Sequence, residues 1–249
     1  MLENNLQKVH PSWQPIVNVA LQKLSSDYVI KLYDSKSWLP GLAKFLNAFS
    51  LPINKTRIIL FGESPYPRAE SANGYAFWDA SVSSIWSTKG LSKTVNRATS
   101  LRNFVKMLLV SGNYLTSDAV SQPAIVTVDK TQLVQTLDEL FENLINHGFL
   151  LLNTSLVYDE SHSVAFHVKA WRPFIASILE QLASIKPNIT LLLLGRLAAT
   201  LDKLAITQKF QRFYAPHPYN LSFIANTQIQ AFFRPFNLLV KSDYNVVGA

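Results

Sequence analysis

The stretch that decides the fold is residues 61–78, which read FGESPYPRAESANGYAFW. It follows Arg-Ile-Ile-Leu at residues 57–60, a β-branched and apolar run that is typical of a buried strand beginning near residue 57 and ending near 61. Gly62 permits a tight turn, and Pro65 and Pro67 each restrict one φ angle of the loop that follows. Such a stiff loop at the carboxyl end of a strand is where open α/β sheets bind ligands. Taken alone, however, Gly-x-x-Pro favours an ordinary turn.

Three further apolar runs predict strands, at residues 149–152, 189–194 and 211–215. Helical spacing predicts helices over residues 92–110, 131–147, 171–185 and 196–204, and another within 222–240, whereas residues 111–130 read as a loop. Strands separated by helices favour a parallel arrangement. We therefore expect an α/β fold of three α/β/α layers around a central, mainly parallel four-stranded sheet.

The whole chain, residues 1–249, is expected to form one domain, with a helical N-terminal cap over residues 1–52. In this cap, Leu42, Phe45, Leu46 and Phe49 lie at helical spacing and predict a helix.

Composition narrows the class of protein. Hydrophobic residues make up 48% of the chain and charged residues 16%, which indicates a globular protein. The net charge of +7 favours a polyanionic partner, although a merely basic protein would carry the same charge. The absence of cysteine excludes disulfides, thiolate nucleophiles and cysteine-bound metals or clusters. No signal peptide or membrane-spanning run is visible, so we expect a cytoplasmic protein without a membrane partner.

The opening stretch resembles the water-activating loop of uracil-DNA glycosylases, which reads Gly-Gln-Asp-Pro-Tyr-His and continues to Gly-x-Ala-Phe. The matching positions are Gly62, Pro65, Tyr66, Gly74, Ala76 and Phe77. The variant Pro-Tyr-Pro resembles the poxviral members. The resemblance implies that Phe77 stacks on a flipped uracil and that Tyr66 fills the space beside C5, where thymine carries its methyl group.

The resemblance departs from the family at the catalytic position. Ser64 stands where the family has its catalytic aspartate, so it would orient the attacking water without supplying a negative charge. Glu63 stands one residue earlier, where the family has glutamine, and whether its carboxylate substitutes is left open. Gly-Glu-small-Pro also resembles cluster-containing glycosylases that work without the aspartate, but those use cysteines, which this chain lacks.

Asn153 follows the second predicted strand, in the sequence Leu-Leu-Leu-Asn. Its amide can donate and accept at once, which matches the N3–H and O4 of uracil, whereas cytosine presents the reverse pattern. An asparagine at a strand end is normally a turn residue, but Leu-Leu-Leu-Asn resembles the family's uracil-reading motif. A weaker match, Phe166-His167-x-x-x-Trp171, resembles Ser-His-x-x-x-Gly-Trp, and a structural histidine is the favoured interpretation of His167.

Residues 215–222 read Ala-Pro-His-Pro-Tyr-Asn-Leu-Ser and resemble the family's Ala-Pro-His-Pro-Ser-Pro-Leu-Ser. The resemblance implies that His217 hydrogen-bonds uracil O2 as the base leaves, and that Leu221 enters the duplex in its place. It also implies DNA-backbone contacts by Ser222, by Tyr219 in place of a serine, and by Ser100, which begins Ser-Leu-x-Asn in a basic helical stretch.

Three hypotheses follow. The first is a monomeric uracil-DNA glycosylase that needs no cofactor, acts in base excision repair on single- or double-stranded DNA, and is slowed by Ser64. The second is a catalytically weak or inactive protein that binds uracil-containing or damaged DNA. The third, a small-molecule-binding α/β protein, would need neither Leu221 nor the basic excess. No metal site is expected, because the histidines lack a coherent ligand spacing with carboxylates.

Overall fold

A four-stranded sheet organises the computed structural model, which describes residues 2–35 and 37–241. The chain divides into two compact units, one made of Met1–Ser81 and Gly148–Tyr214 and the other of Val82–His147 and Ala215–Ala249. That the chain is a single domain stays a prediction.

The strands are β1 (Ile58–Gly62), β2 (Trp86–Ser87), β3 (Gly90–Leu91), β4 (Phe149–Asn153), β5 (Thr190–Leu194) and β6 (Gln211–Ala215). The α-helices are α1 (Gln14–Leu21), α2 (Ser26–Ser35), α3 (Lys93–Arg97), α4 (Thr99–Ser111), α5 (Gln122–Thr127), α6 (Leu137–Asn146), α7 (Val164–Ile185), α8 (Arg196–Leu201), α9 (Ser222–Ala225) and α10 (Thr227–Phe233). Short 3-10 helices lie at Leu2–Lys8, Pro11–Trp13, Asn47–Ser50, Ile53–Lys55, Ala205–Lys209 and Arg234–Phe236.

The four main strands lie in the order β4-β1-β5-β6. β1 pairs in parallel with β4, from Ile58 opposite Phe149 to Gly62 opposite Asn153, and also in parallel with β5. Every residue of β1 and β4 is buried, as is typical of parallel strands covered on both faces. The expected α/β fold with a mainly parallel four-stranded sheet is confirmed, and each of its four strands lies within one residue of its predicted bounds. The two-residue strands β2 and β3 were not predicted.

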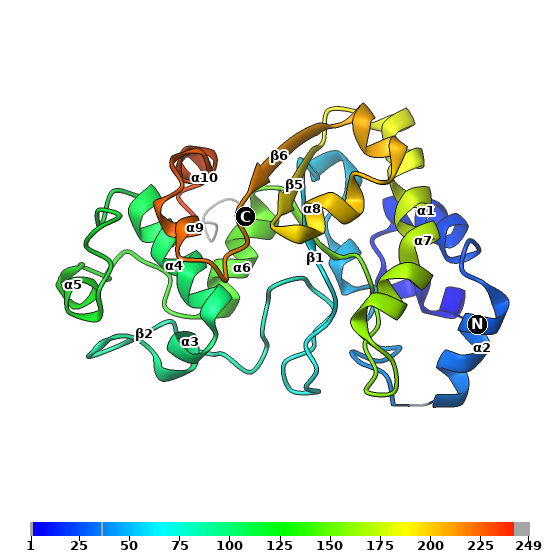
Figure 1. The fold of residues 1–249 in the computed structure, drawn as a ribbon, viewed down its shortest axis with the longest axis horizontal. Coiled ribbons are helices and arrows are strands. Elements are labelled where there is room, and N and C mark those ends of the chain that lie inside the picture. Colours follow the sequence, from blue (N-terminus) through cyan, green and yellow to red (C-terminus); the bar gives the residue numbers. More distant parts are fainter. Residues whose placement is uncertain (1, 36, 242–249) are drawn as a thin grey trace, which may run out of the picture. The chain divides into compact units, whose positions relative to one another are not determined.

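One face of the sheet forms a common core with α1 and α7, which pack against each other (Figure 1). The alternate residues Ile59 and Phe61 of β1 enter this core. The α7 side chains buried in this core form two rows at helical spacing. They are Trp171, Phe174, Ile175, Ile178, Leu179 and Leu182. The helical spacing of α7 therefore presents one apolar face to the sheet.

The N-terminal segment belongs to the same core as the strands. Trp13 is fully buried, and its indole N–H donates to the carbonyl of Leu51 over 2.7 Å. Its ring lies edge-on to Phe49, with 5.2 Å between centroids. The helix expected from Leu42 to Phe49 is wrong, because residues 42–46 form turns and are followed by a short 3-10 helix in which Phe49 has non-helical dihedrals (φ −86°, ψ 31°).

Several helix boundaries differ from those predicted. α6 begins at Leu137 rather than at residue 131, because Thr136 and Glu139 form a capping box. α7 begins seven residues earlier than expected, with the Ser163 hydroxyl accepting from the backbone N–H of Phe166. The predicted helix at residues 92–110 is broken at Ala98 into α3 and α4, and α5 lies in the expected loop.

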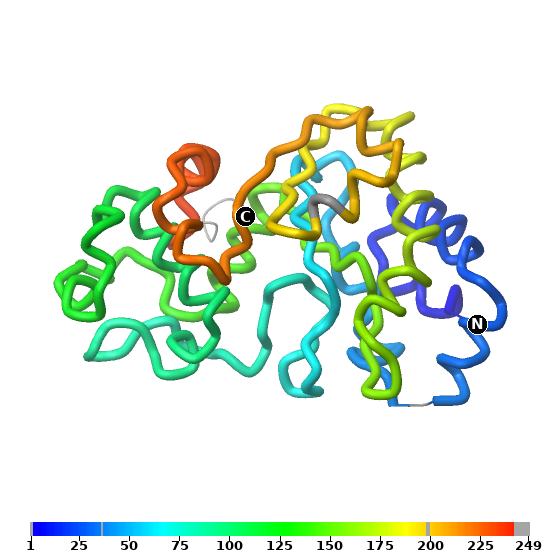
Figure 2. Tube along the Cα trace, in the orientation of Figure 1, coloured from blue at the N-terminus to red at the C-terminus, as the bar shows by residue number. Residues whose placement is uncertain are grey.

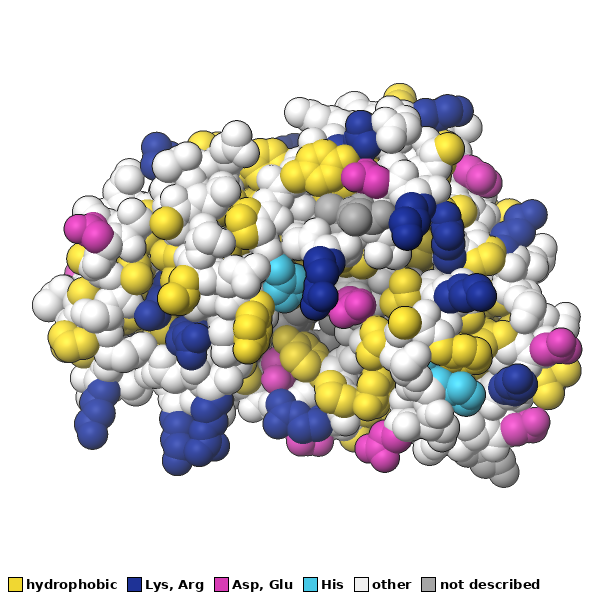
Figure 3. Space-filling model, viewed as in Figure 1, with side chains coloured by type: hydrophobic (Ala, Val, Ile, Leu, Met, Phe, Trp, Pro, Cys, Tyr) yellow, Lys and Arg dark blue, Asp and Glu magenta, His cyan; other side chains and the backbone are white. Residues whose placement is uncertain are grey.

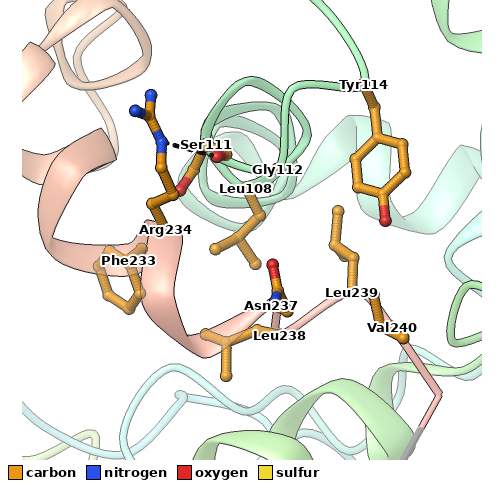
Figure 4. Close-up of a pocket in the computed structure, with 10 residues that line it drawn as sticks. All are labelled: Leu108, Ser111, Gly112, Tyr114, Phe233, Arg234, Asn237, Leu238, Leu239 and Val240. Carbon is orange, nitrogen blue, oxygen red and sulfur yellow. Dashed lines mark hydrogen bonds between the residues drawn. The ribbon is translucent and has the colours of Figure 1, made fainter.

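The second unit is built around α4, which packs against α9 and α10. The C-terminal part of the described chain is fixed by Asn143 of α6, whose amide donates to the carbonyls of Leu238 (2.9 Å) and Val240 (2.8 Å). A small pocket lies between α4 and residues 233–240, with Leu108, Tyr114 and Arg234 in its lining (Figure 4). Its volume of about 10 Å³ suits one water and is far too small for a nucleobase.

None of the described helices combines the length and the apolar composition that a bilayer-spanning segment needs.

Candidate active site

The ends of β1 and β4 bring a glycine and an amide side chain together. Gly62 lies opposite Asn153 in the sheet, and Asn153 is only 3% exposed. A Cβ atom on Gly62 would overlap Asn153 Oδ1 and would lie 2.8 Å from Ala76 Cβ. The absent side chain of Gly62 is therefore what leaves room for the Asn153 amide.

The long loop after β1, drawn in cyan in Figure 2, is attached at both ends by hydrogen bonds to β4 or to Thr154, the residue that follows it. At the start of the loop, the N–H and the hydroxyl of Thr154 donate to the carbonyls of Gly62 and Glu63, both over 2.9 Å. At its end, the N–H of Ala76 donates to Leu151 over 3.0 Å. Asn153 lies between the two attachment points, Leu151 and Thr154. The position of its side-chain amide relative to the loop is therefore fixed.

Two aromatic residues of the loop, Tyr66 and Phe77, are joined by a hydrogen bond. The hydroxyl of Tyr66 donates to the carbonyl of Phe77 over 3.0 Å, and burial raises the pKa of Tyr66, which keeps the phenol protonated. Phe77 has a φ of +65°, a left-handed conformation that costs a bulky residue about 1–2 kcal/mol. Strain of this kind persists only where the surrounding structure holds the residue, so the backbone at Phe77 is fixed by its neighbours.

Ser64 and Glu63 follow β1 directly. The Ser64 side chain is half-buried, and its hydroxyl donates to the carbonyl of Pro65 over 3.3 Å. The Glu63 side chain is exposed, although its backbone is fixed. Ser64 offers a neutral hydroxyl that can accept from a water, and Glu63 is the adjacent carboxylate in the chain.

A buried carboxylate also lies in this loop. Asp79 is 2% exposed, and it binds Arg68 over 3.2 Å and accepts from the N–H and hydroxyl of Ser81 over 3.0 and 2.6 Å. These contacts join Asp79 to Arg68 near the start of the loop and to Ser81 just after it.

In the second unit, the backbone determines how the imidazole of His217 is protonated. Its Nδ1 accepts from the N–H of Tyr219 over 3.1 Å, so the proton of the neutral ring is on Nε2, which is the donor nitrogen. The segment is held from α4 by Asn103, whose amide donates to the carbonyls of Pro218 (2.8 Å) and Tyr219 (3.3 Å). His217 is thus presented on a braced turn.

The same segment exposes large side chains. Leu221 is 72% exposed and Tyr219 is 66% exposed, although they stand only two residues apart. Ser222 is also exposed and begins α9, and Ser100 is half-buried in the first turn of α4. An exposed leucine and tyrosine next to a braced histidine are suited to contact with another molecule.

Comparison with known proteins places the chain. Residues 50–241 match the Uracil DNA glycosylase superfamily. The crystal structure of the wild-type UNG from Nitratifractor salsuginis is 41% identical in sequence, superposes with a TM-score of 0.92 and is matched over 97% of each chain. The chain belongs to the uracil-DNA glycosylase superfamily.

More distant members of the superfamily are also similar. The uracil-DNA glycosylase of Amoebophilus asiaticus is 25% identical over 215 residues, 84% of each chain. That of Aliivibrio salmonicida is 28% identical over 188 residues, 75% of this chain and 70% of its own. The resemblance read from the sequence motifs is confirmed.

The superfamily site residues expected from the sequence fall into two groups. The first unit holds Glu63, Ser64, Tyr66, Phe77 and Asn153, all in β1, β4 or the loop between residues 63 and 80. The second unit holds Ser100, His217, Tyr219, Leu221 and Ser222. In the first unit, hydrogen bonds of Thr154 and Ala76 join the end of β4 to the loop. In the second unit, four of the residues lie within 217–222, whereas Ser100 lies apart in α4. The role of each residue stays a prediction.

Several residues that fix the candidate site residues by hydrogen bonds or ion pairs were not predicted from the sequence. Asn103 is in the Ser-Leu-x-Asn motif, and an asparagine among the apolar positions of a helix could have signalled a buried bond. Thr154 follows Asn153 directly, and no local pattern distinguishes its role. Asp79 and Arg68 are eleven residues apart, and nothing in the loop sequence indicates their pairing.

Proposed function

We propose that the chain is a uracil-DNA glycosylase that hydrolyses the N-glycosidic bond of a uracil extruded from DNA, releasing the base for base excision repair. Superfamily membership supports this reaction. The observation that carries it is the Asn153 amide, enclosed beside Gly62 and attached to the loop that carries Tyr66 and Phe77. An edge reader and two aromatic side chains on one element suit the recognition of a single flipped base.

Each group of the first unit has a distinct task in this proposal. The Asn153 amide donates to uracil O4 and accepts from N3–H, a combination that cytosine cannot satisfy. Phe77 stacks on the base, and Tyr66 occupies the space that thymine's methyl needs. Because a methyl group alone is worth only ~1–3 kcal/mol of discrimination, the bond from Tyr66 to the Phe77 carbonyl supports selectivity by keeping the ring fixed.

The bond between C1′ of the sugar and N1 of uracil breaks with its electron pair going to the base. The Nε2–H of His217 donates to uracil O2 and stabilises the developing anion, a contribution of ~10²–10³ in rate for one donor. A water positioned by Ser64 adds its oxygen to C1′, and the proton that it loses balances the charge of the departed uracil. Glu63 precedes Ser64 in the chain, and the negative charge of its carboxylate would favour the cationic sugar.

DNA is held by residues of the second unit. Leu221 fills the space that the flipped base vacates, and Ser100, Tyr219 and Ser222 donate to backbone phosphates. The net charge of +7 supports a polyanionic partner, and Lys and Arg side chains are spread over the face drawn in Figure 3. We further propose that the protein acts as a monomer in the cytoplasm, which suits a cysteine-free chain.

The test is single-turnover cleavage of strands that carry one uracil, one cytosine or one thymine at the same position. We expect cleavage at uracil alone, and for Asn153→Asp a loss of preference for uracil over cytosine, because an ionised carboxylate accepts but does not donate. Tight binding of uracil-DNA without any cleavage would overturn the enzymatic proposal in favour of a binding protein. Unchanged selectivity in Asn153→Asp would remove Asn153 as the edge reader.

A further inference from the structure

A cluster of nitrogen and oxygen donors lies in the first unit, between the end of β4 and the start of α7. Asp159 Oδ1 is 3.1 Å from His162 Nδ1, and Asp159 Oδ2 is 3.1 Å from His167 Nε2. The donor atoms of all three residues lie within 4.8 Å of one another. None of these three side chains has a task in the glycosylase proposal.

One atom of this cluster is buried without a hydrogen bond. His167 is 1% exposed, and its Nε2 makes no hydrogen bond within the described chain, although Asp159 Oδ2 lies 3.1 Å away. An unsatisfied buried polar atom is costly and rare in folded proteins. A bound cation shared with Asp159 would satisfy this atom.

The imidazole ring of His167 is oriented by a contact at its other nitrogen, Nδ1. Its Nδ1 lies 2.7 Å from the hydroxyl oxygen of Tyr28, which also accepts from the indole N–H of Trp171 over 2.9 Å. When Nδ1–H donates to Tyr28, the lone pair of His167 is on Nε2 and faces Asp159. Metal-binding histidines have this arrangement, in which an outer partner fixes the ring and its tautomer.

The other two side chains of the cluster differ in how firmly they are held. Asp159 is held by the N–H groups of Ser161 (2.8 Å) and His162 (2.9 Å), both donating to Oδ1. The His162 ring stacks on Phe166 with 4.4 Å between centroids, and its side chain is 39% exposed. The cluster thus has a rigid buried side and one accessible ligand through which an ion can enter.

We propose that Asp159, His162 and His167 bind one divalent ion of the zinc class, with water at the remaining position. Two imidazoles and a carboxylate suit Zn²⁺, Co²⁺ or Ni²⁺ rather than Mg²⁺ or Ca²⁺, which prefer oxygen ligands. Bonds of ~2.0–2.1 Å in a tetrahedral site place neighbouring ligand atoms roughly 3.3 Å apart. Asp159 Oδ2 lies at similar distances from both rings, 3.1 Å from His167 Nε2 and 3.3 Å from His162 Nδ1. The bound ion would join residues 159–162 to α7 and, through Tyr28, to α2.

The test is Zn²⁺ titration of the full chain, carrying no histidine tag and stripped with a chelator, followed by calorimetry. We expect one Zn²⁺ per chain, no Mg²⁺ binding under the same conditions, and a higher melting temperature with Zn²⁺. Co²⁺ should give the visible absorption of a four-coordinate site. His162→Ala, a change at an exposed side chain, should weaken Zn²⁺ binding by roughly 100-fold or more.

His10→Ala is the matched control, because it removes a histidine elsewhere in the same unit, and it should bind Zn²⁺ like the wild type. Asp159→Asn provides a second variant of equal size, and circular dichroism checks that both variants fold. The proposal is overturned if the wild type binds no Zn²⁺ at micromolar concentration, or if both His162→Ala and Asp159→Asn bind it undiminished. Neither measurement depends on DNA cleavage.

Discussion

Ser64 places a neutral hydroxyl where the family resemblance implies a carboxylate. We expect Ser64→Asp to raise the single-turnover cleavage rate by up to ~10², because orientation of water and a charge that favours the cationic sugar return together. Ser64→Ala serves as the control that removes the hydroxyl alone. If Ser64→Asp is slower than a wild type that cleaves well, the chemistry belongs to another group, with Glu63 the first to be tested.

Gly62 leaves space for the Asn153 side chain, and this steric role can be tested separately from any effect of glycine on the backbone. A methyl group there overlaps Asn153 Oδ1, so Gly62→Ala should displace the amide and lower the cleavage rate by ~10², as misplacement of a reactive contact does. The rate is measured in a double-mutant cycle with Asn153→Ala. In the Asn153→Ala background the glycine substitution should cost clearly less, because only the 2.8 Å contact with Ala76 Cβ remains. An equal cost in both backgrounds would show that Gly62 acts on the backbone instead.

Among the elements, the turn at residues 216–220 depends on α4. Asn103→Leu keeps a similar shape but leaves the carbonyls of Pro218 and Tyr219 unsatisfied, which should lower the free energy of unfolding by ~1–3 kcal/mol. It should also lower the cleavage rate, because His217 loses its brace. Denaturant unfolding and single-turnover cleavage measure the two effects.

Asn143→Leu is the matched control for Asn103. Asn143 is also buried in the second unit and also donates to two carbonyls, those of Leu238 and Val240. The Asn143→Leu variant should show a similar decrease in the free energy of unfolding, while its cleavage rate stays that of the wild type. Equal rate losses in the two variants would mean that Asn103 acts only through stability.

The strands were predictable from sequence, because a strand buried on both faces is a continuous apolar run. Residues 149–152 were expected, and β4 extends from Phe149 to Asn153. Helix starts were less predictable. Leu133 fits the apolar spacing of α6, yet it is buried because it bridges to Val240 far along the chain. Its burial reflects a non-local contact, which no local window contains.

The same reason separates the predicted site residues from the missed ones. Asn153 could be proposed because its position at a strand end is a local property. Asn103 meets Pro218 across 115 residues, so its role appears only in the folded chain. The donors of the proposed metal site were overlooked because the order Asp-x-x-His followed by x₄-His fits no familiar ligand spacing, and the turn at residues 159–163 decides their proximity.

For the whole molecule, charge makes a prediction about DNA affinity. Binding to an uncleavable uracil-containing strand should weaken by at least ~10-fold between about 50 and 200 mM salt, since cationic side chains displace counterions from phosphate. Fluorescence anisotropy across a salt series gives the slope. Inhibition by free uracil should stay nearly constant, because the base is uncharged. A flat affinity for DNA would argue against recognition through phosphates.

The alternation of the chain between two units has a consequence for its synthesis. β1 lies at the centre of the sheet, but its partner β4 is translated roughly 90 residues later and β5 later still. At ~5–20 residues per second, the apolar strand Ile58–Gly62 leaves the ribosome several seconds before either neighbour exists. During that interval β1 is an exposed apolar segment of the nascent chain, and the N-terminal helices are the part already translated that can cover it. Chaperone capture on the ribosome, mapped by crosslinking, should concentrate there and end once residue 194 has emerged.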